Sequence, residues 1–240
     1  TQSMSSKKLL ALYGLKWNPF APNVPVEGLW VSPRLERFLW QVESLLPSGG
    51  FAMVTGEPGE GKSAALRILD HRLQKLPDVS VGHLQRPQSN LADFYPEIGD
   101  LFSVSLRPHN RWAGFQVLRD RWRAHMEATL LRPVLLIDEA QLAPTPCLTE
   151  LRLLQSDHFD SQSLLFTILC GDGQLPERFR GADLLPLGSR IGPRLLLTPQ
   201  PPELLQEYLN FALEQAGCPQ LMTTELIRTL AAHAANNMRV

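Results

Sequence analysis

Eight residues, GEPGEGKS at positions 56–63, have the types and spacing needed to bind phosphate groups. They fit the pattern G-x-x-x-x-G-K-[ST] between an apolar run and a helical pattern, which is typical of a phosphate-binding loop. The glycines let backbone amides turn toward phosphate oxygens at the positive end of the next helix. Lys62 would reach the β- and γ-phosphates, and the Ser63 hydroxyl would coordinate Mg²⁺. The predicted nucleotide contacts are Gly56, Glu57, Pro58, Gly59, Glu60, Gly61, Lys62, Ser63 and Ala64.

A second group of residues tests this interpretation. The stretch PVLLIDE at 133–139 is an apolar run that ends in two adjacent acids. Asp138 is placed to hold Mg²⁺ through water, as the acid at a strand end does in phosphate-loop enzymes. Glu139 could polarise a water for attack on the γ-phosphate, which predicts hydrolysis as well as binding. The sequence lacks the guanine-reading NKxD motif, so ATP is the expected nucleotide.

Positioning these residues requires a sheet with helices on both faces. Five short apolar runs are expected to be buried parallel strands, and they alternate with five helical patterns. The expected strands are 51–55, 79–84, 133–137, 164–169 and 194–197, and the expected helices are 62–75, 89–102, 111–130, 146–156 and 173–180. This alternation predicts an α/β phosphate-loop fold with a five-stranded parallel sheet.

The chain divides into three predicted parts. Residues 1–48 form a Pro- and aromatic-rich arm without periodicity, and residues 49–198 form the α/β domain. After PQPP at 199–202, two amphipathic helices at about 202–216 and 223–235 form a small helical lid. The sequence stops without a helix cap or a breaker, so we expect the lid to be incomplete.

Composition excludes several classes of protein. The formal net charge is −1, so any contact with nucleic acid must come from a local basic patch. The three cysteines are far apart and the six histidines show no metal-like pairing, which argues against a disulfide framework and a zinc site. No stretch reaches the roughly 18 apolar residues of a membrane span, and no signal peptide is evident. We expect a cytoplasmic location.

The order of these motifs resembles that of the AAA+ ATPases over roughly residues 30–240. The resemblance implies that Asp172, after the strand LLFTILCG, senses the γ-phosphate; capping of the next helix is the open alternative. It also implies that LLPLGSRIGPRLLL at 184–197 carries an arginine finger that reaches the ATP of a neighbouring subunit. Arg190 is the first candidate for the finger and Arg194 the second. Arg239, in AAHAANNMRV, resembles the lid arginine that points back at the phosphates.

A narrower resemblance comes from YGLKWNPF at 13–20, followed by GEPGEGKS and LLIDEAQ. Together they resemble the family of ExeA secretion ATPases and of TniB-, TnsC- and MuB-like transposition helpers. The transposition helpers assemble on duplex DNA with ATP and present this DNA to an integrase-type transposase. This branch is the predicted one, which implies a homo-oligomer, duplex DNA and a transposase as partners. An ExeA-like secretion or envelope-assembly ATPase is the alternative.

A local positive cluster is the candidate DNA contact. Residues 107–123 carry five arginines against one acid, and phosphate contacts with counterion release would supply affinity for any sequence. The alternative is an ordinary solvated helix face. On this expected helix, Trp112 and Trp122 belong to an apolar stripe that packs on the core. The candidate arginines are Arg107, Arg111, Arg119, Arg121 and Arg123.

Overall fold

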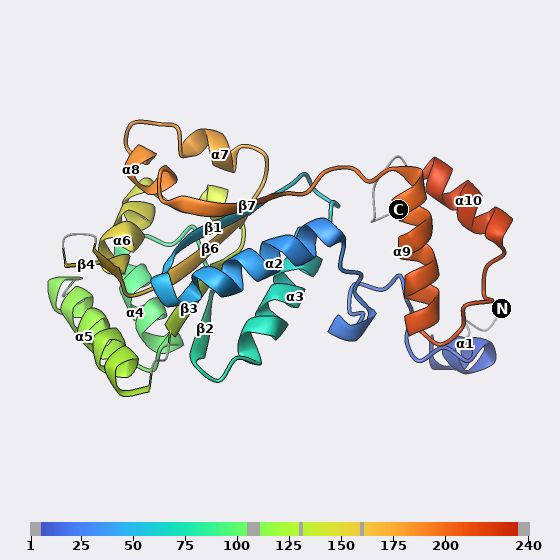
Figure 1. Cartoon of the computed structure of the whole chain (residues 1–240), viewed down its shortest axis with the longest axis horizontal. Coiled ribbons are helices and arrows are strands. Elements are labelled where there is room, and N and C mark those ends of the chain that lie inside the picture. The colour runs from blue at the N-terminus through green and yellow to red at the C-terminus, as the bar shows by residue number, and fades with distance from the viewer. Residues whose placement is uncertain (1–5, 105–110, 130–131, 159–160, 235–240) are drawn as a thin grey trace.

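The central element of the computed structural model is a parallel five-stranded sheet with strand order β2-β3-β6-β1-β7. The structure describes residues 6–104, 111–129, 132–158 and 161–234. All five predicted strands are present in this sheet, so the α/β fold predicted from the sequence is confirmed (Figure 1). The strands are β1 (Gly50–Thr55), β2 (Val79–Leu84), β3 (Arg132–Ile137), β6 (Phe166–Gly171) and β7 (Ile191–Leu196).

Helices cover both faces of the sheet. Side chains alternate along the strands, so Phe51 and Met53 face one core cluster while Ala52 and Val54 face the other. The first cluster includes residues of α4, α5 and α6, and the second includes residues of α2 and α3 (Figure 1). These helices are α2 (Pro33–Leu45), α3 (Lys62–Gln74), α4 (Leu91–Leu101), α5 (Arg111–Thr129) and α6 (Thr145–Gln155). The sheet is therefore the middle of three layers.

Helix α2 was not predicted, although its sequence contains the usual signals. The Ser32 hydroxyl accepts a hydrogen bond from the Leu35 amide at 3.2 Å, and Pro33 occupies the first turn, where proline is tolerated. Leu35, Phe38, Leu39 and Val42 form the buried stripe of the helix. The surrounding proline and aromatic residues hid this three- and four-residue spacing. Helix α1 (Ser6–Tyr13) was also missed.

Strand β7 begins three residues earlier than predicted. It lies at the edge of the sheet, where Ile191, Pro193 and Leu195 point inward and the residues between them are exposed. A proline is acceptable there because an edge strand leaves some amides without a partner in the sheet. Gly192 and Pro193 interrupt the apolar run, which explains the late predicted start.

Short elements complete the described chain. Short helices precede β1, follow β3 and connect β6 to β7, and a two-stranded antiparallel ribbon follows α6. Their bounds are η1 (Val26–Gly28), η2 (Leu46–Ser48), η3 (Ala140–Leu142), β4 (Ser156–Asp157), β5 (Gln162–Ser163), α7 (Leu175–Arg178) and α8 (Leu185–Gly188). Within the described residues, no helix is both long and apolar enough to span a membrane.

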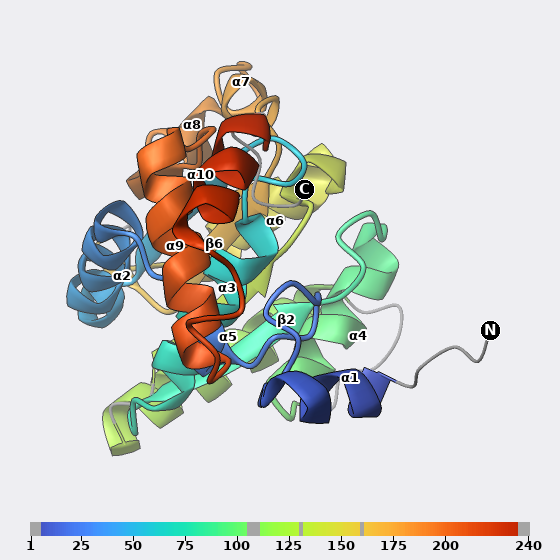
Figure 2. The ribbon, with the colours of Figure 1, turned by 90° about the vertical axis from the view of Figure 1, so that its right-hand side faces the viewer.

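The last two helices, α9 (Pro202–Gln215) and α10 (Thr224–His233), pack on each other beyond one end of the sheet. Figure 2 shows α9 and α10 side by side, with α1 near their lower end. The N-terminal arm contacts α9: the Lys16 amide donates to the Ala216 carbonyl at 2.8 Å, and Trp30 meets Tyr208 edge-on at 6.3 Å. The arm therefore runs between the α/β layers and this helical pair.

Candidate nucleotide-binding site

Strand register brings the predicted site residues to one edge of the sheet. Thr55, the last residue of β1, pairs with Gly171 of β6, and Ile137 of β3 pairs with Leu169. The strands are parallel, so the loops after β1, β3 and β6 all leave at the carboxyl edge. Ligands of open α/β sheets bind in the crevice outside this edge. The glycine-rich loop, the acid pair and Asp172 are the segments found there.

The glycine-rich loop adopts backbone conformations that require glycine. Gly59 and Gly61 have φ angles of 93° and 94°, in the left-handed region that side chains disfavour. A Cβ on Gly56 would lie 2.8 Å from Glu60 Oε2 and 2.9 Å from Leu197 Cβ, so this position also excludes a side chain. Lys62 begins α3, a helix of 13 residues, directly after Gly61. The loop thus leads into a helix N-terminus, where the amides and the dipole favour an anion.

The loop side chains are arranged around the turn. Lys62 Nζ donates to the carbonyls of Gly56 at 2.7 Å and Glu57 at 3.1 Å, which lays its ammonium group across the loop. Glu60 Oε2 accepts the Glu57 amide at 2.6 Å and braces the turn. Ser63 is exposed in the first turn of α3. Of the other predicted contacts, Pro58 is exposed and Ala64 is half-buried.

The acid pair lies beside the loop. Burial, together with the neighbouring Asp138 carboxylate, raises the pKa of the Cys170 thiol, and the Lys62 ammonium opposes that shift. Glu139 also raises this pKa. Cys170 is fully buried near the end of β6, so the three charged side chains that influence it lie near the carboxyl edge of the sheet. Lysine and the two acids are 76 and 77 positions apart in the chain, and the fold brings them together.

The acid pair has an unusual backbone. Glu139 has a φ of 50°, one of three non-glycine residues with positive φ in the described chain. Asp138 Oδ1 accepts the Glu139 amide at 2.9 Å, and the Glu139 carbonyl accepts the Leu142 amide at 2.8 Å. Such a conformation persists only where surrounding contacts enforce it, and it is common at functional sites. The turn leaves the Glu139 side chain exposed and Asp138 half-buried.

These residues fit a magnesium-bound nucleoside triphosphate. The loop offers backbone amides and a lysine to phosphate oxygens, and the Ser63 hydroxyl and the Asp138 carboxylate are the hard oxygen ligands that Mg²⁺ prefers. Mg²⁺ is usually held by one or two protein oxygens together with substrate phosphates. The described residues contain no cluster of three or more His, Cys, Asp or Glu side chains that could hold a metal ion.

Asp172 and Gln141 connect the ends of β6 and β3. Asp172 Oδ1 accepts the Gln174 amide at 2.9 Å in the turn before α7, but the N-cap residue of α7 is Gln174, so Asp172 is not the helix cap. The role of Asp172 as a phosphate sensor stays a prediction. Gln141, to which the sequence analysis assigned no role, donates from Nε2 to Glu139 Oε2 and accepts the Asp172 amide at 3.3 Å. Only the preceding acids could have drawn attention to it.

Arg190, the first candidate finger, lies away from this edge, whereas Arg194 pairs with Met53, two residues before the end of β1. Arg190 precedes β7, whose first residue, Ile191, pairs with Phe51 near the start of β1. Strand β1 is six residues long, so its ends are separated by about 17 Å at ~3.3 Å per residue. Arg190 Nη1 donates to the Pro186 carbonyl and Arg194 Nη2 to the Gly188 carbonyl, each at 3.1 Å. Arg239, the predicted lid arginine, lies outside the described residues.

Two arginines of the predicted basic cluster on α5 pair with a buried acid. Arg119 Nη2 and Arg123 Nη2 donate to Asp157 Oδ1 at 2.6 and 2.7 Å, and Asp157 is only 5% exposed. Asp157 shares its single negative charge between the two guanidinium groups, so Arg119 and Arg123 are bound to the ribbon that follows α6. Their contact with DNA stays a prediction. Arg121 is exposed on α5. Arg107 lies outside the described residues, and of Arg111 only the helical backbone is described.

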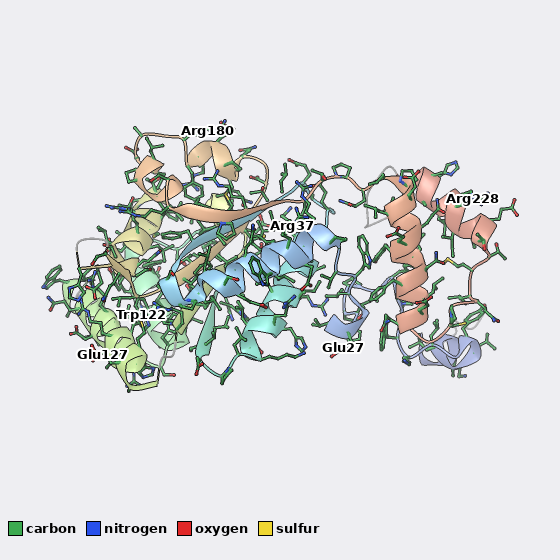
Figure 3. The ribbon with its side chains drawn as sticks, in the orientation of Figure 1. Glu27, Arg37, Trp122, Glu127, Arg180 and Arg228 are labelled. Carbon is green, nitrogen blue, oxygen red and sulfur yellow. The ribbon has the colours of Figure 1, made fainter. Side chains whose placement is uncertain are left out.

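The aromatic stripe of α5 is correct in part. Trp122 is 2% exposed and meets Phe102 edge-on, as predicted, and Figure 3 labels it on α5. Trp112 is 66% exposed, so its predicted place in the core is wrong. It lies in the first turn of α5 and stacks on Phe115 at 5.7 Å. A helix end can project beyond the core even where its apolar spacing continues.

Comparison with protein families identifies the domain. A family model described as "AAA domain" matches residues 47–179, which is more than half of the chain. The matched segment contains the glycine-rich loop, the acid pair and Asp172. The chain therefore belongs to the AAA domain family.

Known proteins resemble this chain in sequence and in fold. General secretion pathway protein A of Aeromonas hydrophila is 33% identical over 224 residues, which are 91% of this chain but 40% of that protein. The chain thus spans well under half the length of this relative. Among solved structures, Cdc6p of Pyrobaculum aerophilum matches with a TM-score of 0.67 at 17% identity. The matched region covers 92% of this chain and 62% of the Cdc6p chain. The Aeropyrum pernix ORC1 protein in complex with DNA has a TM-score of 0.63 at 19% identity, with 92% and 60% covered. These two likenesses show the fold alone.

Proposed function

We propose that this AAA-domain protein is an ATPase that hydrolyses Mg-ATP and whose site is completed by a second copy of the chain. One observation carries the proposal. The parallel register of β1, β3 and β6 brings the glycine-rich loop with Lys62 and the acid pair Asp138 and Glu139 to the same carboxyl edge of the sheet. Nucleotide hydrolysis needs these groups in this arrangement.

Each residue has a separate task. The backbone amides of the loop and the N-terminus of α3 bind phosphate oxygens, and Lys62 neutralises charge on the terminal phosphates. Ser63 and Asp138 would hold Mg²⁺. When bound, Mg²⁺ neutralises negative charge that develops on the phosphates. Glu139 accepts a proton from the attacking water and orients it.

A second copy would supply Arg190. Its backbone lies at the amino edge of the sheet, about a full strand length from the loop of its own chain at ~3.3 Å per residue. Within one subunit it is therefore far from the phosphates, whereas a neighbour packed against this edge would receive its guanidinium. An arginine placed across an interface stabilises the charge of the transition state. Arg194, on the exposed side of β7, is the second candidate. We further propose that α9 and α10 are a lid over the nucleotide.

Steady-state ATP hydrolysis by the purified chain tests the first part of the proposal. We expect Lys62→Ala to abolish hydrolysis and weaken binding of a fluorescent ATP analogue. Glu139→Gln should lower the rate of hydrolysis by roughly 10²–10⁴-fold and retain binding, because it removes only the proton acceptor. Lys75→Ala, on an exposed lysine just after α3, is the matched control and should behave as the wild type. Hydrolysis retained in the Lys62 variant, with normal folding, would overturn the assignment.

Mixing experiments test the shared site. The specific activity of the wild type should rise with protein concentration, because each site needs a neighbour. Arg190→Ala should be inactive alone, and mixing it with Lys62→Ala should restore part of the activity. In such a mixed pair the intact loop of one chain meets the intact arginine of the other. Equal specific activity of Arg190→Ala and wild type at all concentrations would remove the finger assignment.

The cellular role that we propose first is that of a secretion-pathway ATPase. The support is the 33% identity, over 91% of this chain, to a protein named General secretion pathway protein A. A DNA-assembling transposition helper that recruits a transposase is the second candidate. Its support is the exposed Arg121 on α5, but the pairing of Arg119 and Arg123 with Asp157 leaves fewer charges for phosphate contacts.

Duplex-DNA binding separates the two roles. Fluorescence anisotropy would be recorded with a slowly hydrolysed ATP analogue or ADP, across a salt series. The secretion role predicts no binding at concentrations where the analogue is bound. Tight binding only with the analogue, falling steeply with salt, would favour the transposition helper, since counterion release dominates such binding. An Arg121→Ala variant would then show whether α5 makes the contact.

A further inference from the structure

We infer that Gln141 is a positioning residue that aims Glu139 and links it to the loop after β6. The inference rests on the proposed ATPase function and adds a residue to its machinery. Three observations carry it: the two hydrogen bonds of the Gln141 side chain, the close approach of that side chain to Gly171, and the clamp that Arg178 places on the turn.

The Gln141 carboxamide bridges the Glu139 carboxylate and the backbone amide of Asp172. Its Nε2 donates to Glu139 Oε2, and its Oε1 accepts the Asp172 amide at 3.3 Å. A carboxylate only accepts and an amide nitrogen of the backbone only donates, so these partners fix which end of the carboxamide faces each of them. A side chain with both a donor and an acceptor is required to bridge them. Glutamate lacks the donor and methionine lacks both strong groups.

Gly171, at the end of β6, leaves room for the Gln141 side chain. A Cβ on Gly171 would lie 2.5 Å from Gln141 Oε1, closer than real contacts allow. Gly171 is not among the residues with positive φ, so the close approach, and not backbone conformation, explains a glycine at this position. The carboxamide therefore rests directly on the backbone of the strand that precedes Asp172.

The turn that carries Gln141 is held independently of its side chain. Arg178 Nη1 donates to the Gln141 carbonyl at 2.6 Å, and Nη2 donates to the Ala143 carbonyl at 2.8 Å. The backbone of η3 is thus fixed from the side of α7. Because these bonds use main-chain oxygens, a change of the Gln141 side chain leaves them in place. The side chain can be altered without loss of the turn.

The consequence concerns the proposed water-activating group. Glu139 is exposed, and a free glutamate side chain would populate several rotamers. The bond from Gln141 holds one carboxylate oxygen and leaves the carboxylate aimed in a single direction. Since the other end of Gln141 is bonded to Asp172, a shift of the loop after β6 changes the orientation of Glu139. Gln141 acts through Glu139 and does not touch the nucleotide.

Three variants test the inference by the split between kcat and KM for ATP. Gln141→Met and Gln141→Glu keep the length of the side chain but lose the donor. Gly171→Ala displaces the carboxamide without changing it; its other near neighbour is the Leu175 side chain. We expect kcat to fall about tenfold or more in all three variants, because each loses the charge-assisted hydrogen bond between Gln141 and Glu139. The dissociation constant of a fluorescent ATP analogue should change less than about twofold. Gln162→Ala, on an exposed glutamine of β5, is the control and should match the wild type.

A double-mutant cycle separates positioning from a structural effect. Single-turnover hydrolysis of radiolabelled ATP would be measured for Gln141→Met in the wild-type and Glu139→Gln backgrounds. A residue that acts through Glu139 has no further effect once Glu139 is disabled. An equal loss in both backgrounds, or a wild-type kcat in Gln141→Met or Gln141→Glu, overturns the inference and leaves the proposed ATPase intact. Absence of hydrolysis in the wild type overturns the proposed function and this inference with it.

Discussion

Replacing Asp157 by alanine should destabilise the fold strongly while leaving the nucleotide site unchanged. The Asp157 carboxylate accepts from Arg123 Nε and Nη2 at 2.7 Å and from Arg119 Nη2 at 2.6 Å, and it is 5% exposed. Its loss removes the acid bonded to Arg119 and leaves Arg123 with the exposed Asp120. Breaking a buried pair costs about 3–5 kcal/mol, and we expect the lower end because the Arg123 side chain is 35% exposed.

Thermal unfolding followed by circular dichroism is the assay for this variant. About 3 kcal/mol corresponds to a fall in Tm of roughly 6–12 °C for a chain of this length. Asp120→Ala is the matched control, because Asp120 also pairs with Arg123 but is 71% exposed. Its change should stay below about 1 kcal/mol. Equal Tm values for the two variants would refute the argument that Asp157 is a buried structural acid. Arg119 and Arg123 would then be surface charges that Asp157 does not hold in place.

The same cluster predicts the sign of a pH effect. Hydrogen bonds from Arg123, together with the charge of Arg119, hold the pKa of the Asp157 carboxyl well below its usual range. An unfolded aspartate titrates near pH ~3.9, so the stabilisation by Asp157 is complete above that pH. It is lost only as the pH falls through the lower pKa of the folded state. The stability difference between wild type and Asp157→Ala should be constant from about pH 8 to pH 5 and shrink below about pH 4.

Two further predictions concern cysteines and tryptophans. At pH 8, an aromatic disulfide reagent should label Cys218 quickly and the other two thiols only on unfolding. Cys147 and Cys170 are buried, and burial with the nearby Glu150 carboxylate raises the pKa of Cys147 to about 11. Rapid labelling of all three thiols would contradict this burial. Trp122→Ala should cost about 3–5 kcal/mol in a urea titration, whereas Trp112→Ala should cost less than about 1 kcal/mol because Trp112 is 66% exposed; equal costs would show that the two side chains are equally buried.

Much of the fold followed from local patterns in the sequence. The strands are short apolar runs in a sheet covered on both faces, so each is recognisable without knowledge of its neighbours. The elements that were missed had weaker or mixed signals. The buried stripe of α2 lies beside a proline-rich arm, and β7 alternates between inward and exposed residues because it is an edge strand.

The role of the arginines on α5 could not be settled from the sequence. Arg119 and Arg123 are 38 and 34 positions from Asp157, and nothing in the local pattern shows that this acid is buried between them. A run of arginines on a helix looks the same whether it faces solvent or a buried carboxylate. The exposure of Trp112 was missed for the same reason, since periodicity does not reveal where the core ends.

By itself, the sequence determined the phosphate-binding loop, the acid pair and the class of fold. The glycines, the lysine and the acids have few substitutes in their chemistry, so their identity and spacing carry the information. Only the tertiary structure decided which side chains meet. It brought Lys62 to Asp138 and Glu139, placed Arg190 at the opposite edge from its own loop, and set Gln141 between Glu139 and the Asp172 amide. These relations depend on strand order and register, which arise from packing of the whole chain and not from any short segment.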